Sequence, residues 1–229
     1  MSNAAPIRAQ ALRLTRTDAC GAPVPEATAN SRVTTDGFIT VGLAAEVFTS
    51  QDIEVIGADG ASKVFSKGVS SLRGFNVTIQ ISDFNLAVLE LTGQSSILTD
   101  YAAPVELVGG VVHADGSINN STVMLEWWPE NSKNDACAAV AAGGNPRRPY
   151  IHMIAPRVNR WVISGNLDFG NQASVITLTA YAEPSTAFLP SRAADEFTAA
   201  DEADLQANGV LAWREVTALP AITAAGYDL

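Results

Sequence analysis

The sequence predicts a mainly β protein: an antiparallel β-sandwich or partly closed barrel with one short flanking α-helix at about residues 83–92 and a C-terminal extension. Three observations predict this class. Apolar and polar residues alternate in several segments, most clearly at residues 75–81 and 160–183, and this alternation is typical of strands with one buried face. Gly-, Asn-, Asp- and Pro-rich turns separate these segments. Helical periodicity combined with helix-end signals is clearest in one short segment, residues 83–93.

The first strand is expected at residues 7–14, where Gly21 to Pro25 close it as a loop. The β pattern resumes at residues 33–47, which are expected to form one strand. Asp36-Gly37 would then be a turn or bulge near its start. A further strand is expected around Ile53 and Val55.

Residues 57–74 are rich in Gly and Ser, and they are expected to form a long, locally basic loop. They contain Lys63, Lys67 and Arg73 against the single acidic residue Asp59. Long loops in compact domains are more often functional or disordered than idle.

The strand at residues 75–81 leads directly into the expected helix. Ser82 or Asp83 is the expected N-cap, and Gly93 stands where a left-handed C-terminal residue belongs. The helix should place one apolar face on the sheet, made by Phe84, Ala87, Val88 and Leu91.

Two more strands are expected at residues 105–113 and 122–128, followed by a loop at 129–149 and a strand that starts at Pro149 and ends near Pro156. Residues 160–183 are expected to form a β-hairpin with its turn at Gly170-Asn171-Gln172. These predictions give a β domain at residues 1–184. The acidic extension at 185–229 would contain a helix at 198–209 and a last strand at 210–216.

Composition limits the functional classes. The chain has 229 residues and a formal net charge of −10, and such a surface repels phosphate backbones. No run reaches the roughly 18 apolar residues of a membrane span, and the N-terminal residues lack the apolar region of a signal peptide, so a cytosolic origin is expected. Cys20 and Cys137 are far apart and are expected to be unpaired thiols. Neither a metal site nor a cofactor is expected.

Candidate catalytic residues are few. The two histidines, His113 and His152, lie in strand-like runs and are expected to be structural, because no GxSxG motif accompanies them. The most enzyme-like feature is the run from Glu126 to Glu130, since two carboxylates beside Trp127 and Trp128 could serve a glycosidase or a sugar platform. The two tryptophans must point to opposite faces of a strand, however, which favours one core and one edge or interface role. The Asp-Gly turns and the GNP turn lack the spacing of Ca²⁺ or phosphate loops.

Four parts of the chain together resemble one protein family, the major tail tube proteins of long-tailed (siphovirus-type) bacteriophages, particularly those that infect actinobacteria. They are DACGAP at 18–23 with VTTDGF at 33–38, DFNLAVLELTG at 83–93, EWWP at 126–129 with IAPRV at 154–158, and LAWREV at 211–216 followed by Leu219-Pro220.

This resemblance implies a non-enzymatic virion protein that is assembled in the host cytoplasm and placed in the tail. Subunits would join edge to edge into hexameric rings, and the rings would stack into a tube around a tape-measure protein, with a tail terminator at the end. DNA would later pass through without specific binding, and no membrane would be involved. Residues 57–74 would contact the next ring, and their Lys63, Lys67 and Arg73 would meet an acidic surface of an adjacent subunit, made by Asp201, Glu202 and Asp204.

Other functions stay open from the residues alone. A tail terminator or another head–tail ring protein would form one ring without extending. A carbohydrate-binding or adhesin module would use Trp127 or Trp128 as its platform. A glycosidase built on Glu126 and Glu130 is the enzyme alternative.

Overall fold

The computed structural model describes residues 6–18, 20–24, 31–56, 58–60, 62–82, 85–100, 107–112, 121–131, 149–164, 175–185 and 209–222. This part of the chain is mainly β, as the alternating pattern predicts, with twelve strands and one helix. The elements are β1 (Pro6–Arg16), β2 (Arg32–Thr35), β3 (Phe38–Thr49), β4 (Ile53–Ile56), β5 (Ser62–Ser66), β6 (Ser70–Ile81), α1 (Leu86–Leu91), β7 (Ser95–Asp100), β8 (Leu107–Val112), β9 (Val123–Asn131), β10 (Tyr150–Ser164), β11 (Ile176–Ala182) and β12 (Ala212–Val216).

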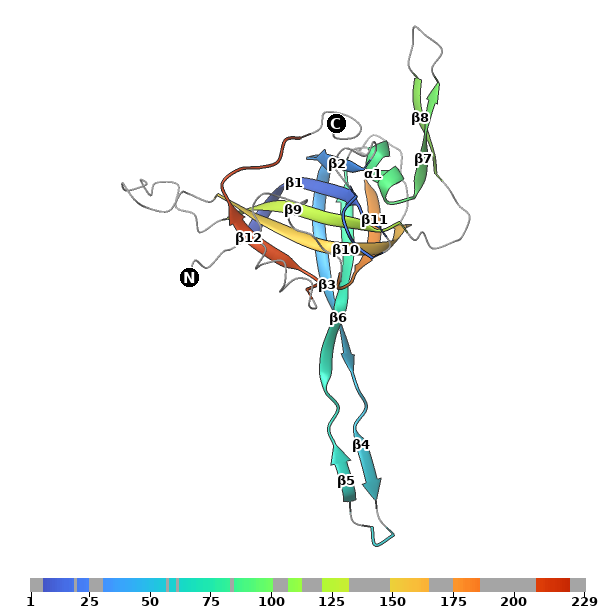
Figure 1. Ribbon diagram of the computed structural model, residues 1–229, viewed down its shortest axis with the longest axis vertical. Helices are drawn as coiled ribbons and strands as arrows, with labels where there is room; N and C mark the ends of the chain where they lie inside the picture. The colour runs from blue at the N-terminus through green and yellow to red at the C-terminus, as the bar shows by residue number, and fades with distance from the viewer. Residues whose placement is uncertain are drawn as a thin grey trace, which may run out of the picture.

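Eight strands form one antiparallel sheet in the order β2-β1-β9-β10-β11-β6-β3, with β12 added to β10. The sheet is open, because β2 and β3 end its path. Strand β10 connects two layers. Its first part pairs with β9 and β12, whereas its last part pairs with β11. In Figure 1, β1, β9 and β10 cross β3, β6 and β11 at a large angle, so the sheet folds over itself as a sandwich.

The core lies between these layers. Alternate side chains of the strands face one another there, which is what the period-2 pattern predicts. Its largest fully buried side chains include Leu12, Leu14, Ile79, Leu125 and Trp161. Helix α1 closes one end and contacts β1 and β2.

Helix α1 begins later than the sequence suggested. Its N-cap is Asn85, whose side-chain oxygen accepts hydrogen bonds from the backbone N–H of Ala87 (3.0 Å) and Val88 (3.3 Å). Ser82 instead uses its N–H to bond to the carbonyl of Gly37, so it belongs to the end of β6. The expected left-handed Gly93 is confirmed, with φ +70°.

Strand β10 runs through the break that was expected near Pro156. The pairing of β9 with β10 shifts register between Ala155 and Val158, and Pro156 falls inside this irregularity. Proline has no N–H to donate, and a bulge is one of the few sheet positions that need none. The predicted hairpin is confirmed at the level of pairing, since β10 and β11 are antiparallel neighbours.

Residues 33–47 form two strands instead of one. Strand β2 pairs with β1, β3 pairs with β6, and Asp36-Gly37 lies between them. The Gly37 N–H bonds to the Thr35 hydroxyl (3.0 Å), which fixes the turn. The turn or bulge expected at Asp36-Gly37 is thus a turn, and it separates two strands that pair with different neighbours.

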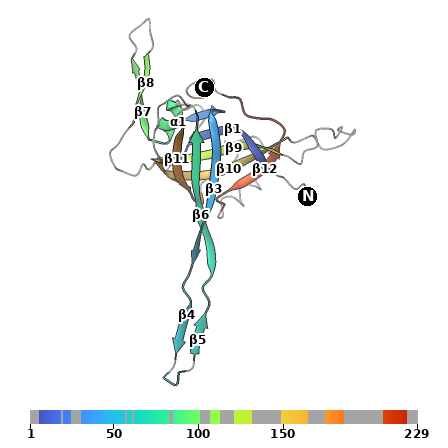
Figure 2. The same cartoon turned by 180° about the vertical axis from the view of Figure 1, so that it is seen from behind.

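The expected long loop at residues 57–74 is largely a β-ribbon. Strand β5 pairs with β4, and β6 already begins at Ser70 and pairs with β3. Figures 1 and 2 show β3 and β6 leaving the body as a twisted ribbon that continues into β4 and β5, and we call residues 46–73 the arm. The arm projects away from the body along the longest axis of the molecule (Figure 1).

A second hairpin, β7–β8, projects toward the opposite end of the longest axis (Figure 1). Strand β7 was not expected. The expected strand at residues 105–113 is β8, which pairs with β7, and the expected strand at 122–128 is β9, which pairs with β1 and β10. The last strand is confirmed as β12, which pairs with β10. The hairpin turn at Gly170 to Gln172, residues 198–208 of the expected second helix and most of the loop at 129–149 lie outside the described residues, as do Asp83 and Phe84 of the first expected helix.

Candidate interaction surface

The arm carries most of the exposed large apolar side chains in the described part of the chain. Of the twelve such residues, eight lie on the arm: Val47, Phe48, Ile53, Val55, Ile56, Phe65, Val69 and Leu72. Scattered exposed apolar residues are ordinary, but a contiguous group on a projecting element marks an interaction site. The sequence interpretation missed this surface, although Ile53 and Val55 followed by the turn-forming Asp59-Gly60 are a hairpin signal that could have found it.

A polar joint divides the arm into a proximal ribbon (β3 with β6) and a distal hairpin (β4 with β5). The Ser50 hydroxyl accepts from the Val69 N–H (2.9 Å), and an Asp52 carboxylate oxygen accepts from the Gly68 N–H (2.5 Å). A Cβ on Gly68 would lie 1.9 Å from the Ser50 carbonyl oxygen. The two backbones therefore approach each other closely enough at this joint to require glycine.

The edge of β3 offers a second kind of contact. Strand β3 has twelve residues and pairs with β6 on one side, and its other side pairs with no described strand. An unpaired edge exposes backbone N–H and C=O groups that another strand can complete. The sheet thus ends in a long edge that continues into the arm.

The basic residues expected at the ring-to-ring contact all lie on the arm. Arg73 is exposed in β6, and its guanidinium lies over the Phe48 ring, 4.3 Å from the ring centre. Lys67 is exposed at the polar joint, and Lys63 belongs to β5. Their expected acidic partners, Asp201, Glu202 and Asp204, lie outside the described residues.

The outer face of β3, β6 and β11 is polar. It alternates with the core positions and presents small or hydroxyl and amide side chains: Thr40, Gly42, Ala44, Asn76, Thr78, Gln80, Thr177 and Thr179. At one end of this face, Glu46, Tyr181 and Arg160 line a shallow hollow of about 420 Å³. Burial, and then the hydrogen bond and charge of Glu46, raise the pKa of Tyr181.

Arg160 reaches this hollow through an unusual backbone. It has φ +56° and is the only non-glycine residue with positive φ in the described part of the chain. It lies in the register shift between Asn159 and Val162, and its guanidinium is 5.6 Å from the Tyr181 ring centre. Bulges of this kind redirect a side chain, and no sequence signal identified this one.

The most enzyme-like run in the sequence forms a buried ion-paired cluster. Glu126 is fully buried on β9, and both its oxygens accept from the Arg13 guanidinium at 2.6 Å. Its Oε1 also lies 3.0 Å from His152 Nε2, and the carboxylate can only accept, so the Nε2–H donates. The His152 ring stacks on Trp128 with ring centres 4.3 Å apart.

Charge pairing controls the ionisation of Glu126. Burial alone would raise the pKa of Glu126, but the charge of Arg13 and the hydrogen bonds from His152 and Arg13 outweigh it and hold that pKa below its ordinary value. His152 is fully buried in this cluster. His113 lies outside the described residues.

The two tryptophans point to opposite faces, as predicted. Trp127 belongs to the main core, whereas Trp128 belongs to a second cluster with Ala11 and Val216. Their exposed fractions are 5% and 3%, so neither provides the open platform that a sugar-binding site would need. Glu130 accepts a hydrogen bond from Gln10 (2.6 Å), whereas Glu126 pairs with Arg13.

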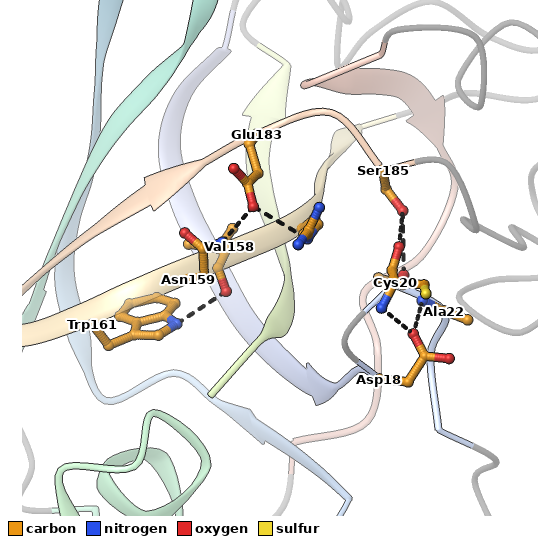
Figure 3. Close-up of polar contacts among 10 residues, drawn as sticks. Asp18, Cys20, Ala22, Val158, Asn159, Trp161, Glu183 and Ser185 are labelled. Atoms are coloured by element: carbon orange, nitrogen blue, oxygen red, sulfur yellow. Dashed lines mark hydrogen bonds and ion pairs between the residues drawn. The ribbon is translucent and has the colours of Figure 1, made fainter. Parts of the chain in front are cut away.

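A polar clasp holds the loop after β1 against the end of β11 (Figure 3). Asp18 accepts from the N–H groups of Cys20 and Ala22, both at 2.9 Å, and the Ser185 hydroxyl lies 3.4 Å from the carbonyl oxygens of Cys20 and Gly21. Cys20 is an exposed free thiol, and Cys137 lies outside the described residues.

A second group of contacts in Figure 3 lies along β10. The Asn159 side chain donates to a Glu183 carboxylate oxygen (2.5 Å), and the Trp161 indole N–H donates to the Val158 carbonyl (3.2 Å). Arg157 also forms an ion pair with Glu183 (3.2 Å). These contacts brace the turn of β10 from one layer to the other.

Within the described ranges, no group of three or more His, Cys, Asp and Glu side chains could hold a metal ion. No helix in the same ranges is long and apolar enough to cross a membrane. No protein-family model and no curated protein matches this chain.

Proposed function

We propose that this protein is a structural subunit, without enzymatic activity, that assembles with copies of itself into stacked rings, as in the tail tube of a long-tailed bacteriophage. One observation carries the proposal: the main sheet ends in the long, unpaired edge of β3, and this edge continues into an arm rich in exposed apolar side chains. In a monomer, the unpaired edge and the exposed apolar side chains both favour aggregation. Pairing between copies would cover both.

The geometry of the contact favours assembly into an extended array. The β3 edge and the arm differ from the opposite end of the sheet, where the four-residue β2 is the edge. A contact between two different surfaces is head-to-tail, and such contacts build rings or filaments instead of closed twofold dimers. Ring closure would then come from the sheet edge, and stacking would come from the arm.

The polar outer face of β3, β6 and β11 is the best candidate for the wall of a central channel. Glu46 and Arg160 are the charged side chains that line its hollow, and the rest of the face consists mainly of hydroxyl, amide and small groups. A wall of this kind would present DNA with few fixed cations to bind. In this proposal, DNA would pass because the wall is polar and has few fixed cations, and the wall would not need a continuous acidic lining.

Negative-stain electron microscopy of the concentrated, purified protein tests the proposal. Tubes of stacked rings are the expected result. Single rings that never extend would assign the protein to the terminator or head–tail ring class, and monodisperse monomers at high concentration would overturn self-assembly altogether.

A further inference from the structure

We infer that the distal hairpin, β4 with β5, inserts between two neighbouring copies of this chain, so that both of its faces are covered at once. The inference rests on the proposed self-assembly and adds to it the way in which the arm is received. A hairpin that merely lay on a partner would need only one apolar face.

The first face of the hairpin is apolar. Ile53 and Val55 alternate along β4 and therefore share a face, and their exposed fractions are 59% and 50%. Their cross-strand positions agree, since Ile53 pairs with Ser66 and Val55 pairs with position 64.

The second face is apolar as well. Phe65 pairs with Glu54, which alternates with Ile53 and so faces the other way. Ile56 follows Val55 and also points to this second face. Phe65 and Ile56 are 64% and 62% exposed, which makes them at least as open to solvent as the residues of the first face.

The proximal ribbon repeats this two-sided arrangement. Val47 pairs with Leu72 on one face, and both are exposed. Phe48 pairs with Ser71 on the other face, where Arg73 covers its ring. The two-sided apolar character therefore extends along the arm and is not confined to its tip.

A hairpin of this size cannot cover these side chains by itself. A two-stranded sheet in water is marginally stable without a packed face, and burial of each exposed side chain would be favourable. The second face would remain in water if only the first one docked. Covering both requires a crevice, and two adjacent copies in an array provide one at every repeat.

Charge favours another copy of this chain as the occupant of both faces. Residues 57–74, the returning side of the arm, contain three basic residues and one acidic residue, whereas the rest of the chain contains 11 basic and 23 acidic residues. The outgoing side, residues 46–56, contains three acidic residues (Glu46, Asp52 and Glu54) and no basic residue, so the two sides of the arm carry opposite charge. The basic returning side is therefore complementary to acidic side chains of another copy, which fixes register and discourages other contacts.

The test compares the two faces by labelling. In a Cys20→Ser/Cys137→Ser background, Val55→Cys on the first face and Phe65→Cys on the second carry an environment-sensitive fluorophore, and Ser50→Cys at the joint is the reference position. Emission is measured before and after assembly. Two-sided insertion predicts a blue shift at both hairpin positions.

Unlabelled variants provide a second measurement, in case a label blocks assembly. The pairs Ile53→Thr/Val55→Thr and Ile56→Thr/Phe65→Thr keep strand-forming residues but remove apolar surface, and Ser62→Thr/Ser66→Thr is the matched control. Each face variant should raise the concentration needed for half-assembly by at least about tenfold, and the control should not.

The outcomes separate this inference from the proposed function. Assembly that responds to one face only would overturn two-sided insertion and leave the tube proposal standing. A wild-type protein that never assembles would overturn both. A blue shift on addition of phosphatidylglycerol vesicles, without assembly, would assign the hairpin to a lipid surface and would also overturn the inference.

Discussion

Glu126, Arg13 and His152 form a hydrogen-bonded cluster of ionisable side chains. They come from three adjacent strands, β9, β1 and β10, and the carboxylate is fully buried. Arg13 also lies over the Trp128 ring, 4.9 Å from its centre. The cluster therefore links β1, β9 and β10 on the face that points away from the main core. Removing one charge would leave the remaining charge buried without a partner.

Glu126→Gln should lower the free energy of unfolding by about 3–5 kcal/mol at neutral pH, because the Arg13 guanidinium would lose its buried counter-charge. Denaturant unfolding followed by tryptophan fluorescence measures the change. The exposed Glu54→Gln is the control and should have little effect. A loss below about 1 kcal/mol for Glu126→Gln would contradict the stabilising role of the pair.

The pH dependence of stability should report the same pair. The pKa of Glu126 is lower in the folded protein than in the unfolded chain, so its contribution is present at pH values above the unfolded pKa and is lost as pH falls through the folded pKa. The wild type should therefore lose more stability than Glu126→Gln between neutral and acidic pH. If the free energies of unfolding of the two proteins changed in parallel with pH, this prediction would be wrong.

The arm is the element that departs most from a compact domain. It joins the body where β6 passes Gly74, at which a Cβ would lie 2.3 Å from the Ala182 carbonyl oxygen. Beyond that point the ribbon has no described element packed on either face. At the polar joint the Ser50 N–H still donates to the Val69 carbonyl (3.2 Å), and the Ser50 hydroxyl and the Asp52 carboxylate add side-chain contacts, so few hydrogen bonds set the direction of the distal hairpin.

Gly68→Ala should loosen the distal hairpin without destabilising the body. The added Cβ would overlap the Ser50 carbonyl, and overpacking of this kind costs about 1–3 kcal/mol. Hydrogen exchange should accelerate in β4 and β5 and stay unchanged in β9 and β10. Gly42→Ala, in the part of β3 that belongs to the body and with ordinary contacts at 3.7 Å, is the control.

The whole molecule combines an acidic surface with two hairpins that project from opposite ends of a sandwich (Figure 1). Net charge opposes association between identical copies, so contacts that bring them together need local complementarity. The basic residues of the arm provide it in the proposed assembly.

The double charge reversal Lys63→Glu/Lys67→Glu should therefore impair tube elongation, and electron microscopy and sedimentation would measure it. Arg8→Glu/Arg16→Glu, on exposed positions of β1, changes the net charge equally and is the control. Only the arm variant should block stacking. Unaffected tubes in the arm variant would refute the proposed pairing with the acidic residues 201, 202 and 204.

The sequence by itself determined the antiparallel β class, the alternating faces of β6 and β11, the opposite orientations of Trp127 and Trp128, and the short helix that precedes Gly93. These properties follow from patterns within a few residues, because strand and helix periods are local. Tertiary structure alone decided how the strands other than β10 and β11 pair, that β10 continues through Pro156, that residues 57–74 return along β3 and β4 as part of the arm, and that Glu126 meets Arg13. Arg13 and Glu126 are 113 residues apart, and no local pattern specifies a partner at that distance.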